Sequence, residues 1–82
     1  MHPMLNTAIR AARQSGRIIL MHYGRLDRLE VTAKGRNDFV SQADTEAEEA
    51  ALEVLTTAYP EHGVLAEESG RQEGGDYTWV VD

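Results

Sequence analysis

The chain has 82 residues, no cysteine and a formal net charge of -6. At this length only about 60% of the unfolded surface is buried, so the chain forms one small domain or part of a larger one. The lack of cysteine excludes a disulfide framework and a thiolate metal site. We find no apolar run that could span a bilayer and no signal peptide, so we expect a cytoplasmic protein.

The charge is unevenly divided along the chain. Residues 1–36 hold seven Arg or Lys and two Asp or Glu, a balance of +5. Residues 37–82 hold one Arg and twelve Asp or Glu, a balance of -11. The acidic half argues against binding of a phosphate backbone there. It suits either cation binding or an ordinary solvated surface.

Residues 3–23 are predicted to form a first helix, with Pro3 in its first turn and Gly24 as its stop. Apolar residues recur at helical spacing and form one stripe: Leu5, Ala8, Ile9, Ala12, Gly16, Ile19, Leu20 and Tyr23. On another face Arg10, Arg13 and Arg17 form a basic row. This row is either solvated surface or a contact for an acidic partner.

The middle of the chain is predicted to be extended. Residues 29–33 alternate apolar and polar side chains as a half-buried strand does. Lys34-Gly35-Arg36-Asn37 has the composition of a turn. Residues 39–41 could then pair back on the preceding strand as a short hairpin.

A second helix is predicted from about Gln42 to Tyr59, ended by Pro60. Ser41 and Asp44 match the spacing of a capping box, which places Asp44 in the first helical turn. The apolar stripe comprises Ala43, Ala47, Ala50, Ala51, Val54, Leu55 and Ala58, and the exposed acidic face comprises Glu46, Glu49 and Glu53.

Two strands are predicted after the second helix. Residues 63–66 form a short apolar run before Glu67-Glu68, and residues 77–81 form a second run before Asp82. A polar loop containing Ser69-Gly70 joins them. Because no helix is evident between the strands, we expect antiparallel neighbours. The chain therefore has an α/β (or α+β) pattern of two helices plus short, mostly antiparallel strands.

Three carboxylates are candidate site residues. Asp82 and Glu67 end buried strands, where ligands bind in α/β sheets, and Asp44 begins a helix. Of the adjacent pair Glu67-Glu68, alternation lets only one face a site, and we favour Glu67. Such acids could bind Mg²⁺, which prefers oxygen ligands, or could be ordinary surface acids.

The basic residues and histidines give weaker signals. Lys34 is the only lysine and could steer phosphate as a point charge, or lie unused on the surface. His2, His22 and His62 lack metal-binding spacing, so zinc is not expected. We expect all three histidines at the surface or at its boundary.

Three motifs occur in order: K-G-x-N-D-F-V-S-x-x-D, L-A-E-E-S-G and W-V-V-D. Together they resemble the start of the inositol monophosphatase family. The opening M-H-P-M-L-N and A-A-R resemble its bacterial branch, the extragenic suppressor proteins. In that family the last motif continues with a second aspartate and a Gly-Thr pair. The resemblance therefore implies that residues 1–82 are the N-terminal portion of one αβαβα layered sugar-phosphatase domain, truncated at W-V-V-D.

The resemblance also implies a function and roles for single residues. The parent would hydrolyse a phosphate monoester, with inositol 1-phosphate as the leading substrate, using Mg²⁺ and with sensitivity to lithium. Nucleotide bisphosphates and sugar bisphosphates are substrates of relatives that share the motifs. Glu67 and Asp82 would be magnesium ligands, with Glu67 also near the substrate. Asp44 would help to activate the attacking water, and Lys34 would lie near the phosphate.

A second function follows from the same resemblance. The bacterial branch is associated with ribosomal RNA transcription through RNA polymerase and elongation factors. Arg10, Arg13 and Arg17 are the candidate contact for such partners. The resemblance further implies a homodimeric parent, no membrane association, and an inactive isolated fragment.

Overall fold

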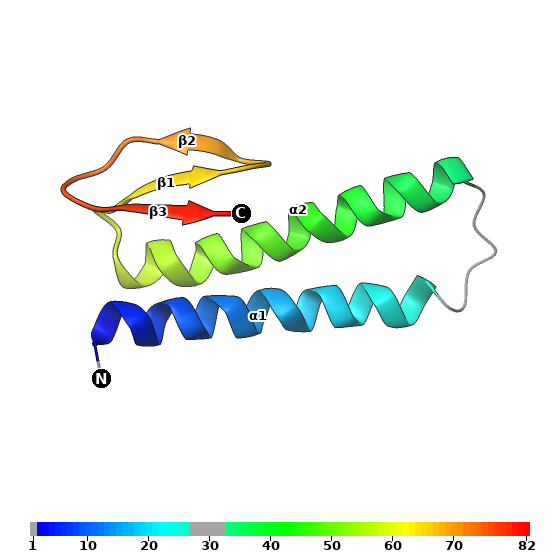
Figure 1. The fold of residues 1–82 in the computed structure, drawn as a ribbon, viewed down its shortest axis with the longest axis horizontal. Helices are drawn as coiled ribbons and strands as arrows, with labels where there is room; N and C mark the ends of the chain where they lie inside the picture. The colour runs from blue at the N-terminus through cyan, green and yellow to red at the C-terminus, as the bar shows by residue number, and fades with distance from the viewer. Residues whose placement is uncertain (1, 27–32) are drawn as a thin grey trace.

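The structure is a computed structural model that describes residues 2–26 and 33–82, with side chains for residues 2–24 and 40–82. In these residues the elements are α1 (Pro3–Leu26), α2 (Ala33–Ala58), β1 (Gly63–Ala66), β2 (Gly70–Gln72) and β3 (Thr78–Val81). The helices form an antiparallel pair, and the strands lie beside the C-terminal half of α2 (Figure 1). This arrangement confirms the predicted α/β class. In the described part, neither helix is long and apolar enough to cross a membrane.

Helix α1 begins where Pro3 predicts and ends later than Gly24. His2 caps its start, because the Met4 N–H donates to His2 Nδ1 at 3.1 Å. Gly24 lies inside the helix, which continues to Leu26. A glycine in a helix interior costs about 1 kcal/mol relative to alanine, which lowers helix stability without ending the helix. The predicted stop at Gly24 was therefore wrong.

The buried face of α1 is not the predicted apolar stripe. Thr7, Ala11 and His22 are the buried residues of this helix, and Thr7 Oγ1 donates to the Pro3 carbonyl at 3.0 Å. Large apolar side chains of the stripe are exposed instead: Leu5, Ile19, Leu20 and Tyr23. Ala11 packs in one cluster with Ala51 and Leu55 of α2, whereas Gly16 and Ile19 of the stripe line an open groove beside β3. Periodicity found an apolar face of α1, but not the one that packs on α2.

Helix α2 begins at Ala33, well before the predicted start. The predicted strand at residues 29–33 lies outside the described residues except for Ala33, which is helical. The predicted turn at 34–37 and extended segment at 39–41 are helical too. Gly35 and Asn37 have low helix propensity, but unlike proline they do not prevent a helix.

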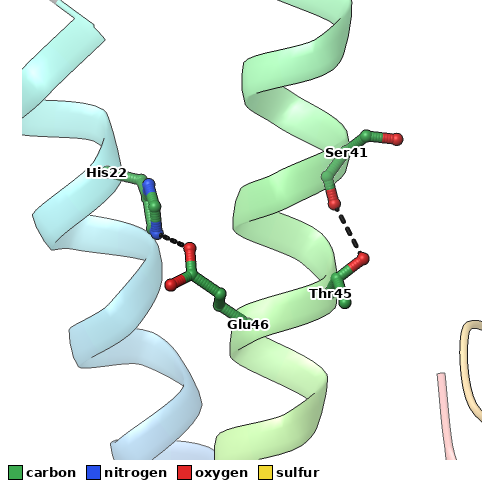
Figure 2. Close-up of polar contacts among 4 residues, drawn as sticks. All are labelled: His22, Ser41, Thr45 and Glu46. Atoms are coloured by element: carbon green, nitrogen blue, oxygen red, sulfur yellow. Dashed lines mark hydrogen bonds and ion pairs between the residues drawn. The ribbon is translucent and has the colours of Figure 1, made fainter.

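The predicted capping box at Ser41 was wrong for the same reason. Ser41 lies in the helix interior, and its carbonyl accepts a hydrogen bond from Thr45 Oγ1 at 3.0 Å (Figure 2). Asp44 is consequently a mid-helix residue and does not lie in a first turn.

Part of the apolar stripe predicted for α2 forms the core, whereas Ala58 at its end is exposed. Ala47, Ala51 and Leu55 are buried at a spacing of four residues. Ala51 and Leu55 form one cluster with Ala11 of α1, and partly buried side chains pack against this cluster: Val54, Trp79 and Val81. The core thus joins both helices to β3.

A contact between an imidazole and a carboxylate also joins the helices. His22 Nε2 of α1 lies 2.5 Å from Glu46 Oε2 of α2 (Figure 2). His22 is only 2% exposed, so the prediction of a surface or boundary position was wrong for this histidine. Glu46 is only partly exposed, since it turns from the predicted acidic face toward α1.

The sheet has the strand order β2-β1-β3. Strand β1 pairs antiparallel with β2 and parallel with β3. The expectation of antiparallel neighbours was therefore wrong for β1 and β3. The predicted polar loop contains strand β2, which returns the chain to the start of β1 and allows a parallel β3 without a helix.

Two glycines allow the chain to cross from β2 to β3. A Cβ on Gly74 would collide with the backbone of His62 and Gly63. A Cβ on Gly63 would lie 3.0 Å from the Gly74 nitrogen and from the Gln72 carbonyl oxygen. The crossing chain therefore passes against the start of β1 with no room for a side chain at either glycine.

Candidate metal and phosphate site

The register of the parallel pair brings two acids together. Ala66 at the end of β1 is opposite Val81 at the end of β3. Glu67 and Asp82 follow these two residues directly. Both acids therefore leave the sheet at the same edge, the carboxyl ends of parallel strands, where ligands bind in α/β sheets.

A cavity of about 220 Å³ lies at this edge, between the strand ends and the two helices. All three predicted acids line it: Asp44 from α2, Glu67 from the turn after β1, and Asp82 after β3. Glu68 also lines it, so the expectation that only one of the adjacent glutamates faces the site was wrong. That expectation assumed the alternating side-chain directions of a strand. Strand β1 ends at Ala66, and Glu67 already lies in a turn.

The remaining lining of the cavity is helical. Ser15 and Ile19 contribute from α1, and Ala47 and Glu48 contribute from α2. Among the described lining residues the only charged groups are carboxylates. A cavity walled by one sign of charge raises the local concentration of the opposite charge. The site therefore favours cations.

Glu48 is the site residue that sequence reasoning missed. It is 8% exposed, and its carboxylate accepts three hydrogen bonds from the turn after β1. Oε1 accepts from the Glu68 N–H at 2.9 Å, and Oε2 accepts from the Ser69 N–H and the Ser69 hydroxyl, both at 2.8 Å. The sequence offered one weak signal: Glu48 adjoins Ala47 of the buried stripe, away from the exposed acids.

The surroundings of Glu48 keep it ionised. Burial raises its pKa, but the N–H and hydroxyl donors of Glu68 and Ser69, with a smaller effect of the Glu67 backbone, together outweigh burial. The pKa of Glu48 therefore lies below its usual value. A carboxylate that accepts several backbone N–H bonds has this behaviour, because the donors stabilise only the charged form.

The backbone of Lys34 lies far along α2 from Asp44. Its backbone is in the first turn of α2, ten residues before Asp44. Ten residues of α-helix rise about 15 Å. Its side chain lies outside the described part, so its contact with phosphate stays a prediction.

The donor set of the cavity fits a hard cation. Among the described residues, no three His, Cys, Asp or Glu side chains lie close enough to hold a metal ion together. Mg²⁺ does not need such a cluster, because it keeps several waters and binds one or two carboxylates plus substrate phosphate. Glu67 and Asp82 are two carboxylates at one edge of the sheet, which matches that number.

The sequence pattern of the inositol monophosphatase family matches residues 1–82. The chain belongs to this family.

Relatives with high similarity over the whole chain carry one name. The chain is 49% identical to Nus factor SuhB of Pasteurella multocida and 45% identical to Nus factor SuhB of Escherichia coli K12, and in each case all of the chain and 32% of the relative are aligned. The chain therefore spans about a third of the length of these relatives.

A solved structure has the same fold. The extragenic suppressor protein SuhB from Bartonella henselae superposes with a TM-score of 0.77 at 32% identity. The match covers 99% of this chain and 30% of that one. The predicted family and its bacterial branch are thus confirmed.

Proposed function

We propose that residues 1–82 are the N-terminal portion of one inositol-monophosphatase-like domain, and that the full-length protein hydrolyses phosphate monoesters with Mg²⁺. The observation that carries this proposal is the parallel register, which sets Glu67 and Asp82 side by side on a cavity shared with Asp44. Family membership supports the reaction class. Inositol 1-phosphate is the proposed substrate, and the enzyme is proposed to be cytoplasmic, dimeric and sensitive to lithium.

Each acid has a distinct role in this proposal. Glu67 and Asp82 bind the metal, and Glu67 also lies near the substrate. Asp44 faces them from α2 and accepts a hydrogen bond from the attacking water, which orients it. Lys34 contributes positive charge near the phosphate. Mg²⁺ held by Glu67 and Asp82 would supply a water of lowered pKa and positive charge beside the phosphate.

The test is phosphate release from inositol 1-phosphate by the full-length protein, with and without Mg²⁺. Chelation with EDTA should abolish release, and added Mg²⁺ should restore it. Glu67→Gln, Asp82→Asn and Asp44→Asn should each lower kcat/KM by about 100-fold or more, because each removes a charge that stabilises the transition state. Glu61→Gln is the matched control, since Glu61 is exposed and does not line the cavity. Turnover that does not depend on Mg²⁺ would refute the proposal.

The isolated 82 residues are proposed to be inactive. Leu65 and Val80 are opposite each other in β1 and β3, and both are exposed on the sheet. Bare apolar sheet surface favours association. Magnesium-dependent turnover by the purified 82-residue chain would contradict the proposal that ligands from further residues are needed.

A second candidate is a binding function in transcription, favoured by the name Nus factor that the relatives carry. Arg10, Arg13 and Arg17 are all exposed on α1, and Arg17 Nη1 donates to Gln14 Oε1 at 3.1 Å. We propose this row as a contact for RNA polymerase or elongation factors. Changing the three arginines to Glu in the full-length protein should abolish copurification with these partners. Arg71→Glu, on the exposed strand β2, is the control. If the triple variant copurified as well as the wild type, these arginines would not form the contact.

A further inference from the structure

We propose that Glu48 is a positioning residue, which fixes the turn after β1 against α2 and so sets where Glu67 meets Asp82. The inference rests on the proposed metal-dependent function and adds a residue that binds neither metal nor substrate. It starts from the three hydrogen bonds of the Glu48 carboxylate, all of which come from Glu68 and Ser69. These two residues directly follow Glu67.

The first step is the orientation of the Glu67 backbone. The peptide unit between Glu67 and Glu68 is planar, so the direction of the Glu68 N–H fixes the plane of the whole unit. That N–H donates to Glu48 Oε1 at 2.9 Å. Glu48 therefore limits rotation about the bond between the Cα and the carbonyl carbon of Glu67, which would otherwise carry the turn away from the sheet edge.

The second step is the tightness of the turn. Residues 67–69 join β1 to β2, and Gly70 closes the turn with a φ of +80°. A three-residue hairpin loop with glycine in the left-handed region is a common closed form. Because Glu48 Oε2 accepts from both the Ser69 N–H and the Ser69 hydroxyl, the far end of the turn is fixed as well as its beginning.

The third step links two walls of the cavity. Glu48 follows Asp44 by four residues, so the two side chains lie on the same face of α2, one turn apart. Both line the cavity. Residues one helical turn apart on α2 therefore have two tasks. Asp44 lines the cavity, and Glu48 binds the chain turn that follows Glu67. In this proposal the Glu48 carboxylate sets the distance between Asp44 and Glu67 across the cavity.

The fourth step is the chemical requirement for a carboxylate. A carboxylate accepts at both oxygens, whereas the amide of Gln accepts at one and donates at the other. Glu48→Gln keeps the shape but sets an N–H against the backbone N–H of either Glu68 or Ser69. Ser69→Ala is milder, because it removes one donor and leaves both backbone N–H bonds in place.

The experiment uses the full-length protein and three measurements: Mg²⁺ affinity by titration calorimetry, amide hydrogen exchange without metal, and kcat and KM at saturating Mg²⁺. We expect Glu48→Gln to weaken Mg²⁺ binding about 10- to 100-fold, as loss of residues that orient metal ligands does. Exchange at the Glu68 and Ser69 amides should accelerate in the metal-free protein. Ser69→Ala should show a smaller weakening of Mg²⁺ binding and remains informative if Glu48→Gln does not fold.

Glu49→Gln is the matched control, since Glu49 is the exposed neighbour on the same helix and should change Mg²⁺ affinity less than twofold. Wild-type Mg²⁺ affinity in both Glu48→Gln and Ser69→Ala, with faster exchange at the turn, would assign Glu48 a purely structural role and overturn the inference. The proposed function would survive that result. A wild-type protein that neither binds Mg²⁺ nor shows metal-dependent turnover would overturn both.

Discussion

The helix pair and the small sheet are stabilised in different ways. The helices run side by side (Figure 1), and Ala11 of α1 packs in one cluster with Ala51 and Leu55 of α2. The strands have only three or four residues each, and their arrangement depends on the Gly63–Gly74 crossing and on Glu48. Two of the three candidate acids come from the sheet. The proposed chemistry therefore depends on the region with the shorter elements.

Substitution in the shared core should have the largest effect on stability. Leu55 is 3% exposed and lies in the cluster that joins both regions. Leu55→Ala should lower the free energy of unfolding by about 2–5 kcal/mol, because it leaves a cavity. Urea unfolding followed by circular dichroism measures this change. Leu20→Ala is the control, since Leu20 is 72% exposed. Equal losses from both variants would contradict the assigned core.

The glycine crossing tests the sheet alone. Gly74→Ala places a Cβ against the Gly63 backbone and should cost about 1–3 kcal/mol, as overpacking does. Gly75→Ala is the matched control, because its Cβ would lie 3.4 Å from the Glu61 carbonyl oxygen. Amide exchange should accelerate in β3 and stay unchanged in α1. If the β3 amides of Gly74→Ala exchanged as slowly as those of Gly75→Ala, the close approach of Gly74 to Gly63 would not be needed for β3 to pair with β1.

Acid should weaken the link between the two regions. The folded pKa of Glu48 is lowered, so its contribution to stability is present above the unfolded value and is lost as pH falls through the folded pKa. The wild type should therefore lose stability on acidification more steeply than Glu48→Gln below about pH 4.5. Melting temperatures measured between neutral pH and pH 3 test this difference. Parallel curves for the two proteins would contradict it.

The His22–Glu46 contact between the helices should have the smallest effect. Glu46 is 41% exposed, so solvent screens its interaction with His22. Glu46→Gln should cost about 1 kcal/mol or less, because the new amide can still hydrogen-bond to the imidazole. Glu53→Gln, on the exposed face, is the control for thermal unfolding. A loss as large as that of Leu55→Ala would mean that the helix pair depends on this one polar contact.

The two regions also differ in how far the sequence predicts them. The stripe of Ala47, Ala51 and Leu55 repeats often enough to identify α2 and its buried face. The segment before Ser41 has the composition of a turn, but the structure continues the helix through it. The local signals of glycine and asparagine are small beside the packing of a long helix pair.

The sheet was predictable where its strands are apolar. Residues 63–66 and 78–81 are rich in apolar residues, whereas Gly70–Gln72 is not, so the sequence did not predict β2. Without β2 the return of the chain was not foreseen, and β3 was expected to be antiparallel to β1. The three acids could be named from position and resemblance, and they line one cavity. Glu48 could not, because its role depends on donors that are about 20 residues away in the chain.

The in-register alignment of β1 and β3 has a consequence for how this protein can vary among species. Gly63 is opposite Thr78, and each stands four residues before one of the two acids. Insertions or deletions between Glu73 and Tyr77 do not change the four-residue spacing from Gly63 to Glu67 or from Thr78 to Asp82. A single residue gained or lost inside either strand would shift one acid along the sheet edge relative to the other. Natural length variation should therefore be rare within the two strands.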